Sequence, residues 1–225
     1  MNESEKSYVV IEFATMQELY DKRTSKNIIL DELQITEVAA VKIKNGQIQD
    51  HYHSFVSIEG YDAKDIEFDD ERVSTFYADA DYLIGAPAFI TVAEQLHEFL
   101  KDGMIVLRSD AVFIRNAFDG FKAKAQSLGL SFDNEVVNIS DILAATKLKK
   151  SIEDSGESFE NMNALQLSKF FKDGRGKWTD IFFDHDIIFD PGSEDPLLKG
   201  RNDPLGWALA FSKLFIVLTA DDGVA

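Results

Sequence analysis

The sequence predicts an α/β fold, a mixed five-stranded sheet with helices on both faces, and two observations lead to it. Three strand-like runs come early, and two of them flank Asn45-Gly46, the dipeptide best suited to a tight type I′ hairpin turn. Short apolar runs then alternate with amphipathic segments, the order expected of strand–helix–strand units with parallel strands. Antiparallel strands followed by parallel ones give a mixed sheet.

The antiparallel part is expected over residues 8–14, 36–44 and 47–57. The first of these lies in YVVIEFATM, which reads as a buried strand. A polar stretch, Gln17 to Lys26, follows the first of these strands. An acidic segment, GYDAKDIEFDDERVS, follows the third strand and is expected at the surface.

Helices and parallel strands are predicted next. GAPAFITVAEQLHEFLKDG is expected to form a helix between Pro87 and Gly103. Its apolar residues recur at helical spacing: Phe89, Val92, Ala93, Leu96, Phe99 and Leu100. MIVLR then fits a buried parallel strand, residues 112–127 a second helix ended by Gly129, and EVVNIS a further strand.

The remaining sequence predicts more helix and one insertion. DILAATKLKK is expected to be helical with Asp141 as its N-cap, NMNALQLSKFFK to be a short helix, and LGWALAFSKLFIVL to close the chain as an apolar helix. WTDIFFDHDIIFDPGSEDPLLKG stands out as an insertion at about residues 178–200. We therefore expect a single domain over residues 1–225 that carries one elaboration.

Composition narrows the function classes. The net charge of −17 and pI of about 4.5 describe an acid-rich surface, which repels nucleic-acid phosphates. The sequence has no cysteine, which excludes disulfides, thiolate metal sites and a cysteine nucleophile. It has no apolar run of about 18 residues, and MNESEKS lacks the apolar core of a signal peptide, so we expect a cytoplasmic protein without a membrane partner.

Glu12 is the acid within the first predicted strand. Side chains two residues apart share a face of a strand, so Glu12 looks the same way as Val10 and Ala14, among apolar neighbours. Such an acid needs a metal, a cation from elsewhere in the chain or a water-filled groove. Which of these applies decides whether the chain performs chemistry.

The order of elements resembles the DnaQ-like (DEDDh) 3′-5′ exonucleases of the ribonuclease H-like fold, over about Tyr8 to Leu218. ITEVAAVKIKNGQIQDHYHSFVSI is similar to the hairpin of that family, and GAPAF to its GAPSF helix start. SDAVFI stands where the family has HNAxFD, and NDPLGWA where it has HRALxDA. The resemblance implies the ribonuclease H-like form of the mixed sheet.

The resemblance also implies that the catalytic set is degenerate. The metal-binding acids of the family fall on Glu12, Ala14, Ile114 and Trp207, and its histidine base falls on Asn202. Two divalent cations ~3.5–4 Å apart repel by about 17 kcal/mol at an effective dielectric of ~20, which one carboxylate cannot offset. An amide does not titrate near neutral pH and so cannot be a general base. We expect no catalytic residues and no cofactor; Mg²⁺ or Mn²⁺ would matter only if residual exonuclease activity exists.

Two metal alternatives stay open. Asp110 and Asp203 could swing toward Glu12 and rebuild a site, which would make the chain a divergent metal-dependent 3′-5′ exonuclease with relocated ligands. His51 and His53 share one face of a strand and could bind zinc, although no third ligand is placed by spacing, and ordinary strand-face histidines are expected. The Asp-His-Asp sequence around His185 is interpreted as a solvated turn.

The leading functional hypothesis is a catalytically inactive exonuclease-like protein. It would act as a binding or scaffolding module for a protein partner, or weakly for a nucleic-acid 3′ end in the ancestral cleft. A homo-oligomerisation protein is a further alternative. Trp207 is the candidate nucleic-acid-binding residue, because it would either fill the cleft or stack a base. Phe182, Phe183 and Phe189 in the insertion would either pack internally or form a partner patch.

Overall fold

A computed structural model describes residues 6–67, 80–108, 112–139, 141–142 and 204–220. The sheet has the strand order β3-β2-β1-β5-β6, and a short strand, β4, pairs with the far end of β1. The strands are β1 (Ser7–Asp21), β2 (Lys26–Lys44), β3 (Gln47–Phe55), β4 (Ile66–Glu67), β5 (Gly103–Leu107) and β6 (Val136–Asn138). The helices are α1 (Phe89–Leu100), α2 (Val112–Ser127) and α6 (Pro204–Ala220), with 3-10 turns at Ala63–Asp65 and Ala80–Leu83.

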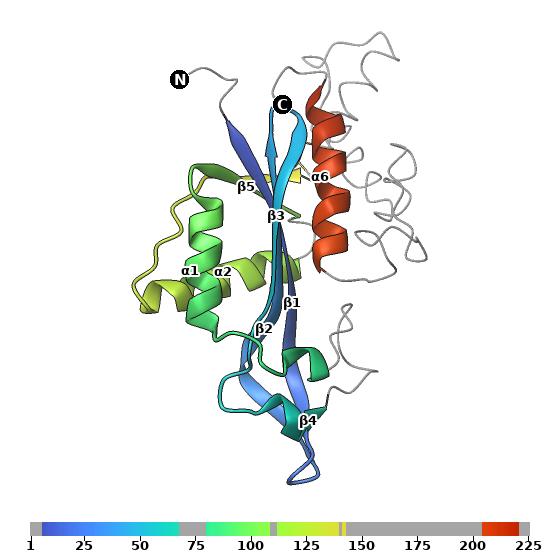
Figure 1. Cartoon of the computed structure of the whole chain (residues 1–225), viewed down its shortest axis with the longest axis vertical. Helices are drawn as coiled ribbons and strands as arrows, with labels where there is room; N and C mark the ends of the chain where they lie inside the picture. Colours follow the sequence, from blue (N-terminus) through green and yellow to red (C-terminus); the bar gives the residue numbers. More distant parts are fainter. Residues whose placement is uncertain (1–5, 68–79, 109–111, 140, 143–203, 221–225) are drawn as a thin grey trace, which may run out of the picture.

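The sheet is mixed, as the sequence predicts. β1, β2 and β3 are antiparallel neighbours, whereas β5 runs parallel to β1, and β6 runs parallel to β5. Figure 1 shows α1 and α2 on one side of this sheet and α6 on the other. The ribonuclease H-like arrangement expected from the sequence is therefore confirmed.

The hairpin between β2 and β3 turns where the sequence predicts. Asn45 and Gly46 have φ angles of +55° and +67°, the left-handed values that a type I′ turn requires at both central positions. Lys44 then pairs with Gln47 directly across the turn. The predicted helix between Pro87 and Gly103 is also confirmed, although Gly103 begins β5 instead of ending the helix.

The predicted bounds of the first two strands, residues 8–14 and 36–44, are too short, because most of the stretch from Gln17 to Lys26 belongs to the sheet. β1 continues to Asp21 and β2 begins at Lys26, so this stretch forms most of the far end of a long hairpin. Register shifts after Ala14 and after Met16 bend β1 at this point. The turn is closed by Asp21, whose carboxylate accepts hydrogen bonds from the backbone amides of Arg23 (2.8 Å) and Thr24 (3.4 Å).

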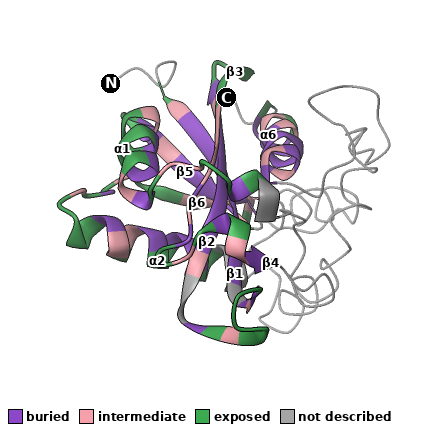
Figure 2. Cartoon of the chain, turned by 60° about the horizontal axis from the view of Figure 1, so that its bottom comes forward, coloured by how far each residue is buried: buried purple, intermediate pink, exposed green. Residues whose placement is uncertain are grey.

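The core divides by the two faces of the sheet, because alternate residues of each strand point in opposite directions. On one face Val9, Ile11 and Phe13 pack against α1 and α2. On the other face Tyr8 and Val10 pack against α6. A smaller cluster around Met16, Leu19 and Ile66 lies in the extended hairpin. Figure 2 shows the buried residues gathered along the central strands and on the inner sides of the helices.

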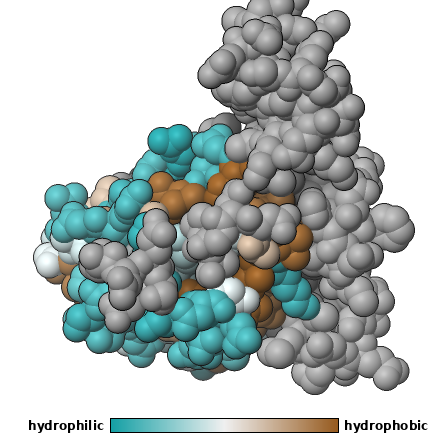
Figure 3. Space-filling view, turned by 90° about the horizontal axis from the view of Figure 1, so that it is seen from above, coloured by the Kyte–Doolittle hydropathy of each residue, from teal (hydrophilic) through white to brown (hydrophobic). Residues whose placement is uncertain are grey.

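Figure 3 shows hydrophilic side chains over much of the face seen from above, with apolar side chains between them. No helix among the described residues is long and apolar enough to cross a membrane. The insertion at about 178–200, and most of the predicted helices between residues 141 and 172, lie outside the described residues.

Candidate functional site

Glu12 faces α6 at the point where β5 ends beside the middle of β1. Val10 of β1 pairs with Val106 of β5. Two residues further along each strand this register places Glu12 next to Arg108, which directly follows β5. Val10 and Val106 belong to the cluster that packs on α6, so Glu12 and Arg108 share that face.

Arg108 forms an ion pair with Glu12. Its Nη2 lies 3.7 Å from Oε2 of Glu12, and the two side chains are 12% and 1% exposed, respectively. The guanidinium carbon lies 5.1 Å from the ring centroids of both Trp207 and Phe211 on α6. These two rings are themselves stacked, with centroids 5.7 Å apart and an interplanar angle of 23°. We call Glu12, Arg108, Trp207 and Phe211 the arginine cluster.

The arginine cluster accounts for the buried acid in β1. Two unit charges about 4 Å apart attract by about 4 kcal/mol at an effective dielectric of ~20. The flat guanidinium also lies against electron-rich ring faces, which attract a cation. Nε of Arg108 is buried and makes no hydrogen bond to a described residue, so ring contacts and the ion pair are what fix this side chain. Of the three explanations open for Glu12, the cation is the one that the structure provides.

A second buried acid lies across the hairpin from Ala14. In the register of β1 and β2, Ala14 pairs with Glu37, and Glu12 pairs with Ala39. Glu37 is only 3% exposed, and its Oε1 lies 2.6 Å from Nε2 of His53 on β3. Since Glu37 and Ala39 are two residues apart, Glu37 shares the sheet face of Glu12. Ala14 itself supplies no carboxylate, but the carboxylate of Glu37 lies on the neighbouring strand, paired across from Ala14.

The two histidines considered as possible zinc ligands differ in their surroundings. His51 is exposed at the edge of the sheet, whereas His53 contacts Glu37 and lies edge-on to Phe55, with ring centroids 5.3 Å apart. Within the part of the chain that the structure describes, no group of three or more histidine, aspartate or glutamate side chains is placed to hold a metal ion.

The other predicted site residues are only partly placed. Trp207 lies in the first turns of α6, partly buried in the arginine cluster. Ile114 lies in the first turn of α2, where the backbone alone is described. Asp110, Asn202 and Asp203 fall outside the described residues, as does His185. Of the predicted positions, Glu12 and Trp207 both contact Arg108, and Ala14 lies two residues after Glu12 on β1.

The residues of the arginine cluster do not fit a pair of divalent cations. A divalent ion within about 4 Å of the Arg108 guanidinium would be repelled by roughly 8 kcal/mol at an effective dielectric of ~20. Glu12 already neutralises that guanidinium, so it adds no net negative charge to the site. Trp207 and Phe211 supply carbon where a metal requires oxygen ligands. The donor set that is described here therefore suits an internal cation and not a bound metal.

Sequence reasoning missed Arg108, Phe211 and Glu37. Arg108 had a readable signal, because YVVIE and MIVLR each end an apolar run with one charged residue of opposite sign. Adjacent parallel strands end at the same edge of a sheet, which brings such residues together. Glu37 is the acid inside the apolar run of ITEVAAV, but its partner is on another strand and could not be read from spacing.

Solved structures share this fold. A 3′-exonuclease determined for its 3′-end-specific recognition of a histone mRNA stem-loop matches with a TM-score of 0.59 at 14% identity, covering 98% of this chain and 84% of that one. A full-length 3′-exonuclease matches with a TM-score of 0.52 at 14% identity, covering 98% of this chain and 62% of that one. The zinc-bound complex of E. coli ExoI with single-stranded DNA matches with a TM-score of 0.53 at 9% identity, covering 96% of this chain and 41% of that one.

These likenesses establish the exonuclease fold for this chain. No protein-family model matches the sequence, and no curated protein does. This chain spans less than half of the E. coli ExoI chain that it matches. What the neighbours bind or cleave is a property of those proteins, and the activity of this one has to be argued from its own residues.

Proposed function

We propose that this protein uses an exonuclease fold as a binding or scaffolding module and does not hydrolyse phosphodiesters. The observation that supports this most is the arginine cluster, because a protein cation lies 3.7 Å from Glu12, the acid that the resemblance aligns with a metal ligand of the family. An enzyme that needs two metal ions gains nothing from a buried guanidinium at that acid. In a protein that uses only the fold, the guanidinium neutralises the buried carboxylate of Glu12 and packs against the rings of α6.

A protein partner suits this module better than a nucleic-acid end. The net charge of −17 repels phosphates at long range, and every phosphate contact would have to overcome it. The ring of Trp207 already stacks on Phe211 and lies against the Arg108 guanidinium, so it is poorly placed to stack a base as well. Nucleic acid remains as a weak ligand of the module.

A divergent 3′-5′ exonuclease is the second candidate, and Glu37 is the observation that favours it. Its carboxylate lies across from Ala14, one strand away from the place of the lost acid. Its close contact with His53 makes a carboxylate–imidazole pair, an arrangement that elsewhere holds an imidazole as a proton acceptor. In this hypothesis Glu37 and Glu12 would both face the scissile phosphate.

One assay separates the two candidates. A 3′-labelled single strand is incubated with Mg²⁺ or Mn²⁺ and with the wild-type protein, Glu12→Gln or Glu37→Gln. The binding-module hypothesis predicts the same background shortening with all three proteins. The exonuclease hypothesis predicts metal-dependent shortening by wild type that falls at least about a hundredfold in either variant, the usual effect of losing a catalytic group. Glu98→Gln, at an exposed helix position, is the matched control for a lost carboxylate.

The strength of nucleic-acid binding can be tested with the same protein. Fluorescence anisotropy of a labelled single strand at low and at physiological salt measures nucleic-acid binding directly. The proposal predicts weak binding that disappears at physiological salt. Tight binding that survives physiological salt would contradict the preference for a protein partner.

A further inference from the structure

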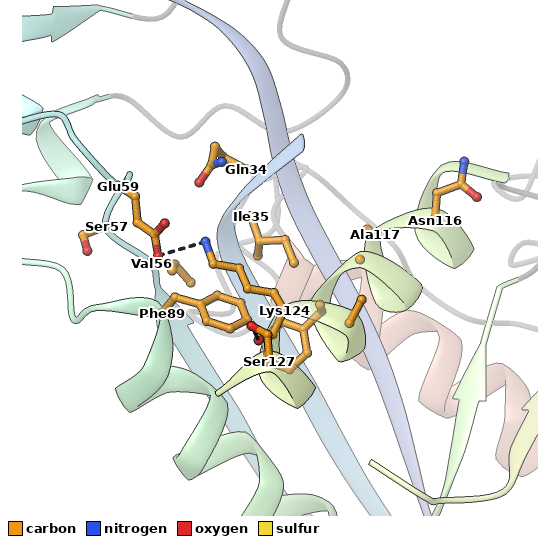
Figure 4. Close-up of a pocket in the computed structure, with 13 residues that line it drawn as sticks. Gln34, Ile35, Val56, Ser57, Glu59, Phe89, Asn116, Ala117, Lys124 and Ser127 are labelled. Atoms are coloured by element: carbon orange, nitrogen blue, oxygen red, sulfur yellow. Dashed lines mark hydrogen bonds and ion pairs between the residues drawn. The ribbon is translucent and has the colours of Figure 1, made fainter. Parts of the chain in front are cut away.

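A cavity of about 650 Å³ lies between β2 and α2, on the side of the sheet away from the arginine cluster (Figure 4). Phe89 and Phe121 at its base are 4% and 0% exposed and pack on each other. Nζ of Lys124 at its mouth lies 2.9 Å from Oε1 of Glu59. These side chains already satisfy one another, and they select no class of ligand.

The turn between β2 and β3, by contrast, carries a reactive pair of residues. Asn45 and Gly46 form the only Asn-Gly dipeptide of the sequence. In such a dipeptide the backbone nitrogen of the glycine can attack the side-chain carbonyl carbon of the asparagine. Gly46 has no Cβ atom to shield its nitrogen from that attack. The reaction then depends on whether the fold leaves these two groups free to meet.

The fold leaves Asn45 exposed at the tip of the hairpin. Its side chain makes no hydrogen bond to any residue that the structure describes. Lys44 and Gln47 are the last pair of the ladder before the turn, and a register shift follows Lys42 on the way to it. β3 is also the edge strand of the sheet. Local opening at such an end costs little, so the turn can leave its native φ angles and close the ring.

Two Asp-Gly pairs among the described residues have related chemistry but are held in place. Gly103, after Asp102, begins β5 and is buried, and a Cβ atom built on it would lie 2.9 Å from Cγ2 of Val9. Asp119 and Gly120 lie inside α2, where backbone N–H groups are bonded within the helix. Ring closure at either pair would require the strand or the helix to open first. The hairpin turn is therefore the reactive position that the structure singles out.

We propose that Asn45 is a site of spontaneous covalent modification, at which the amide is converted to aspartate and isoaspartate. The nitrogen of Gly46 loses its proton and bonds to Cγ of Asn45, and the side-chain nitrogen leaves as ammonia. Water then opens the resulting succinimide ring. Opening at the side-chain carbonyl gives aspartate, and opening at the backbone carbonyl gives isoaspartate, in which the main chain runs through Cγ. Water is the only co-reactant.

The two products differ in their effect on the turn. Aspartate before glycine suits a type I′ turn as asparagine does, and it adds one negative charge next to Lys44. Isoaspartate lengthens the main chain by one carbon atom, so Lys44 and Gln47 no longer oppose each other. The isoaspartate form is therefore the one that loosens the β2–β3 hairpin. This chemistry needs neither the arginine cluster nor the proposed function.

Peptide mapping by mass spectrometry tests this site. The full-length protein is incubated at mildly alkaline pH, either folded or unfolded in urea, and is digested at mildly acidic pH, which stops the reaction. In the folded protein we expect Asn45 to lose its amide at least about tenfold faster than Asn27 and Asn116. Both are exposed asparagines within a strand or a helix, and each precedes a residue with a Cβ atom.

Three further measurements locate the reaction and its effect. Asp102 and Asp119 should isomerise in urea and not in the folded protein. Asn45→Gly, which keeps the turn but lacks the amide, should lower ammonia release from the folded protein to background. The isoaspartate form, isolated by ion exchange, should unfold at a lower urea concentration than wild type, whereas Asn45→Asp should unfold like wild type.

The proposal fails if Asn45 stays intact in the folded protein over the time in which the urea-unfolded chain converts. Equal conversion of Asn45, Asn27 and Asn116 in the folded protein would show that the turn does not select the site. An isoaspartate form as stable as Asn45→Asp would overturn the effect on the hairpin.

Discussion

Nη2 of Arg108 lies 3.7 Å from Oε2 of Glu12, and the guanidinium rests against two stacked rings of α6. This pair joins β1 to the residue that follows β5, two residues beyond the last paired residues of these parallel strands, Val10 and Val106. A cation supplied by the chain itself stands where the resemblance implies metal ions. The Arg108–Glu12 ion pair therefore bears both on the stability of the protein and on whether the site can bind metal ions.

Removing Arg108 should destabilise the protein strongly. Arg108→Met leaves the carboxylate of Glu12 buried without this cation, a loss that typically costs about 3–5 kcal/mol in the free energy of unfolding. The double variant Glu12→Met/Arg108→Met should recover most of that loss, because two apolar side chains need no compensation. Urea unfolding of both variants measures the difference. Arg115→Met, at an exposed position on α2, is the control and should change the free energy by no more than about 0.5 kcal/mol. Equal stability of Arg108→Met and wild type would show that the contact contributes nothing.

Phe121 should be among the costliest core positions. Its ring is fully buried and lies within 5.0–5.6 Å, centroid to centroid, of Phe13, Phe89 and Phe132. Phe121→Ala is expected to lower the free energy of unfolding by about 3–5 kcal/mol, through lost burial and the cavity left behind. Val217→Ala, at a position that is 43% exposed, removes a side chain without opening a core cavity and should change it far less. Thermal or urea unfolding of the two variants compares them. Similar losses in both would mean that the aromatic cluster is not the packed core described here.

The hairpin turn gives a prediction about backbone conformation. Asn45 has φ of +55°, and an alanine at that angle is strained by roughly 1–2 kcal/mol. Asn45→Ala should lower the free energy of unfolding by about that amount. Asn45→Gly, which relieves the strain, should leave it within about 0.5 kcal/mol of wild type. A glycine variant as unstable as the alanine variant would indicate a side-chain role for Asn45 instead.

Asp21 makes part of the stability depend on pH. Burial raises the pKa of its carboxyl, but hydrogen bonds from the amides of Arg23 and Thr24 and the charge of Arg23 outweigh burial, so the pKa lies below its ordinary value. A carboxyl whose pKa is lower in the folded than in the unfolded state stabilises the fold above its ordinary pKa of about 4. That contribution disappears as the pH falls below about 4 and through the folded pKa.

Replacing Asp21 should therefore matter at neutral pH and not in strong acid. Asp21→Asn is expected to be less stable than wild type at pH ~7, with the gap narrowing as the pH falls below about 4. Urea unfolding of the two proteins over this pH range measures the gap. Asp133→Asn, at an exposed loop position, is the control for a change of one charge. A gap that stays constant with pH would contradict the lowered pKa.

Much of the fold could be predicted because its signals are local. The Asn45-Gly46 turn depends on two residues, and the helix of Phe89 and Leu96 on a repeat within one segment. The far end of the β1–β2 hairpin was missed because Gln17 to Lys26 is rich in polar residues, and a two-stranded extension needs apolar residues on one face only. Leu19 and Ile28 are paired across this part of the hairpin, and one apolar pair is too weak a signal to predict two strands from the sequence.

The sequence predicts where the site around Glu12 lies, but not which residues contact Glu12. The alternation of the first strand places Glu12 on a buried face, and the resemblance identifies that face as the ancestral one. The guanidinium that contacts Glu12 belongs to the residue after β5, 96 residues later in the chain, and the ring of Trp207 that contacts it lies on a helix a further 99 residues on. Contacts at such separations depend on the assembled sheet, so no motif within one segment could reveal them.

Metal binding is the most direct test of the claim that Arg108 occupies the ancestral metal site. Thermal unfolding is followed for wild type and for Glu12→Gln at increasing Mn²⁺, so that ions held by the acid-rich surface act equally on both. A site with a Kd of about 0.1 mM would stabilise the protein by about 2.7 kcal/mol at 10 mM Mn²⁺, which raises Tm by roughly 5–10 °C for a chain of this length. We predict that the Tm values of wild type and Glu12→Gln respond to Mn²⁺ alike. A Tm rise of that size in wild type, absent from Glu12→Gln, would contradict it.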